Sequence, residues 1–202
     1  MKNIYILIIA IFFLTFNSCG QKNEKNYNGY TDLEIKTEKC LDKMFEDNDV
    51  DWIELKTIFE NYFSSGKISN SKDPLEKQYE DILSYWERPT MQFPIFTEKK
   101  KVIEIREKLG LEEQDIKKKK QLDCFTNNYI ENKAKVDTTS SFYAYGATLE
   151  TLKEISDISP GLVAGAIKMT MNKSDLKKEL YQKTIVLLFC FDMTLFLTDG
   201  KE

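Results

Sequence analysis

Residues 185–197 read IVLLFCFDMTLFL and are apolar apart from Asp192 and Thr194. Before this run, residues of one helix face recur every three or four positions from Leu176 to Leu188. No Gly or Pro interrupts residues 174–197, which favours a single helix from Ser174 over the alternative of two buried strands. A helix that is apolar on all sides belongs at the centre of a bundle. We therefore expect the other elements to pack around it.

Signals for the start of a helix recur along the preceding chain. Thr31-Asp32-Leu33-Glu34 has the spacing of a capping box, and Asp51 has an acidic residue three positions later. Asp73-Pro74 and Ser159-Pro160 each combine a capping residue with a proline suited to the first helical position. Together with apolar periodicity, these signals predict helices over about 31–47, 51–66, 73–88, 102–109, 111–135, 142–155, from 159, and over 174–197. The sequence thus predicts an all-α fold, an irregular bundle of about seven or eight helices around the apolar C-terminal helix.

Two of these helices have side-chain patterns that predict how they pack. The helix over 31–47 is expected to bury residues that recur at helical spacing, namely Leu33, Thr37, Cys40, Leu41, Met44 and Phe45. The helix from 159 has small residues four apart within 161–166. This spacing predicts that its backbone packs closely against a neighbouring helix.

The N-terminus has the layout of a secretory signal peptide. Lys2 precedes an apolar run from Ile4 to Phe16, which is shorter than the roughly 20 residues that a transmembrane helix needs. Phe16-Asn17-Ser18-Cys19 resembles a bacterial lipobox, and the tract 20–25 resembles the one that follows the lipidated cysteine in surface-exposed lipoproteins of Bacteroidota. The resemblance implies removal of residues 1–18, acylation of Cys19 with palmitate-type chains, and display on the outer membrane. The alternative is a cleaved, soluble exported protein in which Cys19 is an ordinary thiol.

The resemblance also sets the expected domain organisation. Residues 19–30 are rich in Asn, Lys and Gly without apolar periodicity, so we expect a flexible tether whose reach is roughly 20 Å. Residues 31–202 then form a single helical domain, with a polar break at 136–141 as the candidate subdomain boundary. Two acyl chains hold a protein stably on a bilayer, so the domain is expected to stay close to the membrane.

Three cysteines remain once Cys19 is assigned to lipid: Cys40, Cys124 and Cys190. This odd number permits at most one internal disulfide, and the sequence leaves open whether one forms. Cys40 and Cys190 lie among apolar neighbours, so we expect both to be buried core thiols.

Composition excludes several classes of function. The chain has no histidine, which rules out Ser-His-Asp and Cys-His nucleophile pairs, histidine zinc sites and imidazole bases. Without residues 1–18 the chain carries 28 Lys and Arg against 33 Asp and Glu, and this acidity argues against nucleic-acid binding. No calcium-loop, phosphate-loop or Cys-x-x-Cys motif occurs. We therefore assign no cofactor, metal or catalytic residue.

Two candidate sites remain, each with an alternative. The proline-broken connector 87–96 carries Met91, Phe93, Ile95 and Phe96, which form either a partner-binding ridge or a cover for the bundle. Asp192 is a candidate buried acid with a raised pKa, or a paired or exposed residue on the helical line of Lys178. The lysine run 117–120 is interpreted as a helix surface that pairs with upstream acids, rather than as an anion site.

The expected function is a lipid-anchored, non-catalytic binding module of the cell envelope with a protein partner. Such a module could be an accessory subunit of a membrane complex or an immunity-like protector. One alternative is a surface enzyme that cleaves glycans with paired carboxylates, for which Trp86, Tyr143 and Tyr145 would have to line a cleft. Another is a structural protein that binds the cell wall.

Overall fold

The computed structural model describes residues 27–88, 98–110, 122–155 and 159–198, and this part of the chain is all-α. It contains eight α-helices and one 3₁₀ turn, and no strand occurs within these ranges. The elements are α2 (Asp32–Asp47), α3 (Trp52–Ser65), α4 (Leu75–Trp86), α5 (Lys99–Lys108), α6 (Asp123–Asn132), α7 (Ser141–Glu154), α8 (Pro160–Thr170), η3 (Asp175–Lys177) and α9 (Glu179–Thr198). The prediction of an all-α bundle of seven or eight helices is confirmed.

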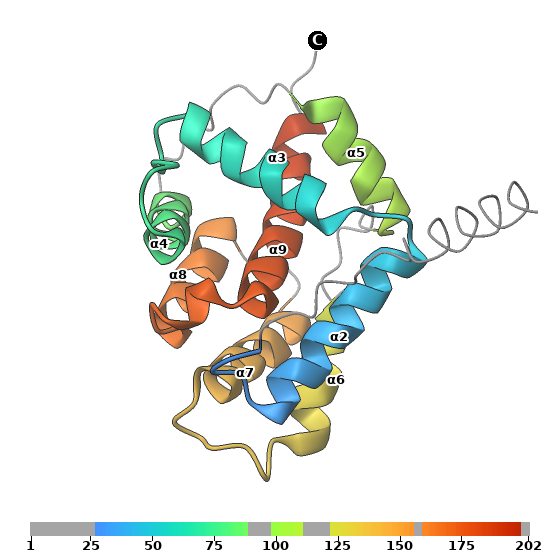
Figure 1. The fold of residues 1–202 in the computed structure, drawn as a ribbon, viewed down its shortest axis with the longest axis vertical. Helices are drawn as coiled ribbons and strands as arrows, with labels where there is room; N and C mark the ends of the chain where they lie inside the picture. Colours follow the sequence, from blue (N-terminus) through green and yellow to red (C-terminus); the bar gives the residue numbers. More distant parts are fainter. Residues whose placement is uncertain (1–26, 89–97, 111–121, 156–158, 199–202) are drawn as a thin grey trace, which may run out of the picture.

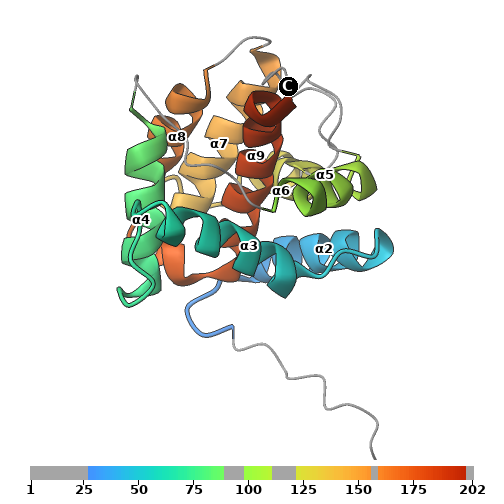
Figure 2. The same ribbon diagram turned by 90° about the horizontal axis from the view of Figure 1, so that it is seen from above.

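Helix α9 is the central element of the bundle (Figures 1 and 2). It runs from Glu179 to Thr198 and includes the whole apolar run, so the two-strand alternative is wrong. Every residue from Leu180 to Cys190 is buried. The ring of Phe189 lies 4.6 Å from that of Phe63 and 4.9 Å from that of Trp86, measured between centroids. The helix begins later than predicted, because η3 occupies residues 175–177 before α9 starts at Glu179.

The other helices cover α9 from different sides (Figure 1). Helices α2, α6 and α7 pack together near the N-terminal end of α9, whereas α3 and α5 contact it further along. Helices α4 and α8 lie side by side and make the most extensive contact between two elements of the described chain. Gly161 of α8 lies against the backbone carbonyls of Trp86 and Glu87, so the predicted close packing of this helix is confirmed.

Most of the predicted helix starts are present. Thr31 and Glu34 form the reciprocal capping box of α2, Asp51 accepts the backbone N–H groups of Ile53 and Glu54, and Ser159 caps α8 ahead of its first-turn proline. Asp73 is an exception, because α4 begins at Leu75 without a side-chain cap. The backbone carbonyl of Asp73 instead accepts a hydrogen bond from the side-chain amide of Gln78 at 2.8 Å.

The prediction for Cys40 is wrong. Cys40 is exposed on α2 and forms a disulfide with Cys124 of α6, with 5.6 Å between the two Cα atoms. The reason is the orientation of α2, which buries Glu34, Thr37, Glu38, Leu41 and Phe45 and leaves Cys40 at the side that faces α6. Cys190 is buried with its thiol, as predicted.

Several predictions lie outside the described residues. These are the signal peptide and lipobox, most of the tether, the apolar connector after Arg88, and the lysine run 117–120. Of the predicted helix over 111–135, the structure describes α6 from Asp123 to Asn132. None of the described helices is long and apolar enough to cross a membrane.

The disulfide generates a stability prediction. Cys40 and Cys124 are 84 residues apart, and loss of a native bridge that closes a loop of this size costs about 2–5 kcal/mol, since the unfolded chain regains conformational freedom. We expect Cys40→Ser to lower the free energy of unfolding in urea by this amount. Cys124→Ser and the double variant should lose the same amount, and reductant should destabilise the parent but not these variants. Equal stability of the parent with and without reductant would contradict the prediction.

Candidate functional site

The predicted site residues lie outside the part of the chain that the structure describes, wholly or for their side chains. Cys19, Met91, Phe93, Ile95 and Phe96 lie outside the described residues. Asp192 lies within α9, but its side chain is also outside the described part.

The aromatic cleft required by the glycan-cleaving alternative does not form as suggested. Trp86 and Tyr145 are fully buried in the core, so neither lines an open cleft. Tyr143 instead packs edge-on against the ring of Tyr129. The polar groups gathered elsewhere, between α2 and the start of α9, are a better candidate site.

Lys183 of α9 is the centre of this polar cluster. Its side chain has no exposed surface, and its ammonium Nζ lies 3.1 Å from Glu38, 2.6 Å from Asp42 and 3.3 Å from Glu179. The same ammonium lies over the ring of Trp52, 5.5 Å from its centroid. A buried charge is tolerated only when it is paired and hydrogen-bonded, and these carboxylates meet that requirement.

Lys178, which directly precedes α9, is the centre of a second group of ion pairs. Its ammonium lies 2.8 Å from Glu34 and 3.2 Å from Asp175, both of which are largely buried. The hydroxyl of Tyr181 donates to the same Glu34 carboxylate at 2.7 Å. Burial and the neighbouring Glu34 carboxylate raise the pKa of Tyr181 above its ordinary value, so this hydroxyl stays a donor.

The spacing of the acids explains why α2 can supply carboxylates to both Lys178 and Lys183. Glu34, Glu38 and Asp42 recur every four residues and therefore form one line along α2. Sequence reasoning missed this line because it scored apolar residues only. The available signal was a lysine just before the apolar run 185–197, together with three acids at i, i+4 and i+8.

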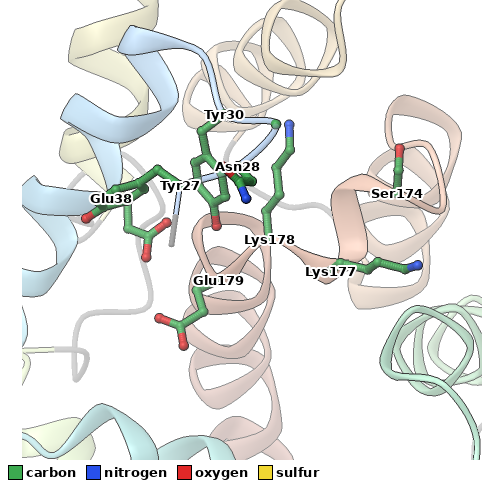
Figure 3. Close-up of a pocket in the computed structure, with 9 residues that line it drawn as sticks. Tyr27, Asn28, Tyr30, Glu38, Ser174, Lys177, Lys178 and Glu179 are labelled. Atoms are coloured by element: carbon green, nitrogen blue, oxygen red, sulfur yellow. The ribbon is translucent and has the colours of Figure 1, made fainter. Parts of the chain in front are cut away.

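A pocket of about 610 Å³ opens beside this cluster (Figure 3). It lies between the segment that leads into α2, α2 itself, and the segment from η3 to α9. The residues that line it are Tyr27, Asn28, Gly29, Tyr30, Glu38, Ser174, Lys177, Lys178 and Glu179. Its volume falls in the range of about 300–1,000 Å³ that is usual for small-molecule sites.

Figure 3 shows the acids and Lys177 on different sides of the pocket, whereas the ammonium of Lys178 lies apart from Lys177, near Tyr30. The carboxylates of Glu38 and Glu179 lie on one side with the hydroxyl of Tyr30 toward them, whereas Ser174 and the ammonium of Lys177 lie on the other. Burial and the Glu38 carboxylate raise the pKa of Tyr30, so this hydroxyl is neutral at ordinary pH. The arrangement can bind a polar ligand through hydrogen bonds and charge.

The carboxylates of this pocket are already engaged by an ammonium group of the protein. Lys183 contacts both Glu38 and Glu179. Outside the pocket, burial raises the pKa of Glu60 of α3, although its neighbour Lys56 opposes the effect. The described residues contain no group of three Cys, Asp or Glu side chains placed to hold a metal ion.

Comparisons of the chain with known proteins found no similar protein. No protein-family model matches the chain, and neither the curated proteins nor the solved structures contain a match.

The buried lysine generates a prediction with a matched control. Lys183→Met leaves the carboxylates of Glu38 and Asp42 without their ammonium, and breaking a buried ion pair costs about 3–5 kcal/mol. Lys36→Met removes an exposed pair between α2 and Glu131 of α6, for which we expect a loss of at most about 1 kcal/mol. Urea unfolding of both variants measures the difference. A loss below about 1 kcal/mol for Lys183→Met would show that the cluster is not a buried charge network.

Proposed function

We propose that the chain is an exported, lipid-anchored cell-envelope protein that acts as a non-catalytic binding module. The disulfide between Cys40 and Cys124 is the observation that carries the exported part of this proposal. Disulfides persist in the periplasm and on cell surfaces, whereas cytosolic thiols are kept reduced. The bridge therefore agrees with the signal-peptide layout of residues 1–18.

The remaining cysteines support a lipid on Cys19. Cys40 and Cys124 bond to each other, and Cys190 is buried in the core, where desolvation raises the pKa of its thiol to about 12. A thiol of this kind is inert toward oxidants, because the thiolate is the reactive form. None of the three is therefore available to form a disulfide with Cys19 in the folded chain. Acylation would account for a fourth cysteine in an oxidising compartment.

The polar pocket supports binding over catalysis. Its acids are held by Lys183 as ion pairs, and its lysines are engaged by acids of α2, η3 and α4. Such a lining presents to a ligand charged groups that the protein itself holds in place. The enzyme alternative would need a carboxyl pair of the kind that glycosidases use, with one member kept protonated.

Lipid attachment is tested by metabolic labelling. In cells fed a radioactive or alkyne-tagged palmitate, we expect the full-length protein to take up label and Cys19→Ser to take up none, because the thioether to lipid forms on that sulfur. Cys40→Ser is the matched control and should keep the label. Labelled Cys19→Ser protein would contradict the proposal.

The binding role is tested by affinity capture with a soluble Cys19→Ser chain that lacks residues 1–18. We expect one near-stoichiometric protein, either from detergent extracts of the same cells or from culture fluid of competing bacteria. The first source would identify an accessory subunit and the second an immunity-like protector. Sedimentation with purified peptidoglycan in place of a protein partner would support the cell-wall alternative. Glycan turnover that a single Asp or Glu substitution abolishes would support the enzyme.

A further inference from the structure

Helix α8 exposes an apolar face at the edge of the bundle (Figures 1 and 2). Met169 and Leu162 are the two most exposed large apolar side chains among the described residues, at 88% and 65%. They are seven positions apart, which is close to two helical turns, so both lie on the same face of α8. The opposite face carries Val163, Ala164 and Ile167, which are buried. Helix α8 therefore has one apolar face toward the core and a second one toward the solvent.

The other side chains of α8 do not make this outer face polar. Lys168 is the only charged residue of the helix, and its ammonium lies 3.0 Å from the carboxylate of Glu87 at the end of α4. Thr170 donates its hydroxyl hydrogen to the backbone carbonyl of Ile167. A helix that is apolar on all sides is normally buried on all sides, and an exposed apolar face is typical of a surface that binds another molecule.

The spacing of the exposed residues fits a second copy of the same helix. Positions 162 and 169 are equally far from the midpoint between Gly165 and Ala166. A two-fold axis through this midpoint places α8 antiparallel to α8 of a second copy and brings Leu162 of each chain opposite Met169 of the other. Ala166 lies close to the crossing point, and its small side chain lets the two backbones approach each other.

The charges beside this face also fit an antiparallel pair. Glu87 runs along the N-terminal half of α8, because Gly161 lies against its backbone carbonyl and Gly165 lies against its side chain. Lys168 lies in the C-terminal half. The two-fold axis turns the Lys168 end of one copy toward the half of the other α8 that Glu87 follows. Opposite charges therefore face each other across the contact, which favours this arrangement.

We propose that the outer face of α8 is the interface of a symmetric, antiparallel dimer of this chain, in which Leu162 of each copy packs against Met169 of the other. Helix α8 has 11 residues and is about 16 Å long, so the contact is small for an interface between proteins. We therefore expect a reversible dimer with a micromolar dissociation constant. The inference goes beyond the proposed function and does not depend on acylation of Cys19.

The geometry is tested by oxidative crosslinking of the full chain in its own cells. The two-fold axis brings position 166 of the two copies together, whereas their positions 162, like their positions 169, are separated by about 10 Å along the helices. Cysteines whose Cα atoms are more than about 7 Å apart cannot form a disulfide. Copper phenanthroline should therefore give a covalent dimer for Ala166→Cys, and none for Leu162→Cys or Met169→Cys. The parent chain provides the baseline.

A charge on the outer face of α8 should weaken the dimer. When Leu162→Lys is added to Ala166→Cys, we expect about a tenfold lower yield of covalent dimer, because the new ammonium would have to be buried against an apolar surface. Ile53→Lys is the matched control, since Ile53 is 61% exposed but lies on α3, and it should leave the yield unchanged. Leu162 and Ile53 are both exposed, so neither variant is expected to unfold the protein.

Three results would overturn the inference: no covalent dimer of Ala166→Cys, an equal yield for Leu162→Cys, or an equal effect of Ile53→Lys and Leu162→Lys. A face that binds a different protein or a membrane instead of a second copy would give the first of these results.

Discussion

The ammonium of Lys183, buried near the N-terminal end of α9, is the constraint on which the arrangement of this structure depends. Helix α9 is enclosed on all sides from Leu180 to Cys190, so Lys183 cannot reach water. An unpaired charge in such a place costs several kcal/mol. The neighbouring helix must therefore supply acids, and α2 does so with Glu38 and Asp42.

This requirement determines which face of α2 is buried. With Glu34 and Glu38 turned toward α9, the stripe of Leu41 and Phe45 also faces the core, and Cys40 is left at the side of α6. The disulfide to Cys124 then ties α2 to α6 at that side. The same orientation places Glu38 in the wall of the polar pocket, which joins the charge network to the proposed binding site.

Sequence reasoning recovered the parts of the fold that depend on local signals. The central helix followed from an uninterrupted apolar run, and the caps at Thr31, Asp51 and Ser159 followed from side chains a few residues from the groups they satisfy. The buried face of α2 was found in part, because Thr37, Leu41 and Phe45 are buried as predicted, whereas Cys40 is exposed. The buried Glu38 could not be found in this way, because its partner Lys183 lies 145 residues away. The pocket escaped prediction for the same reason, since its walls come from segments near both ends of the described chain.

The central claim is that the Lys183 network orients α2 and so brings Cys40 to Cys124. Its most direct test is the equilibrium constant for forming this disulfide against glutathione, measured in the Cys19→Ser chain with and without Lys183→Met. Both reduced proteins must remain folded under the conditions used, as near-ultraviolet circular dichroism can establish. The account predicts that Lys183→Met lowers the constant by at least about tenfold, because α2 then loses its preferred orientation. An unchanged constant would contradict it and would show that apolar packing alone positions α2.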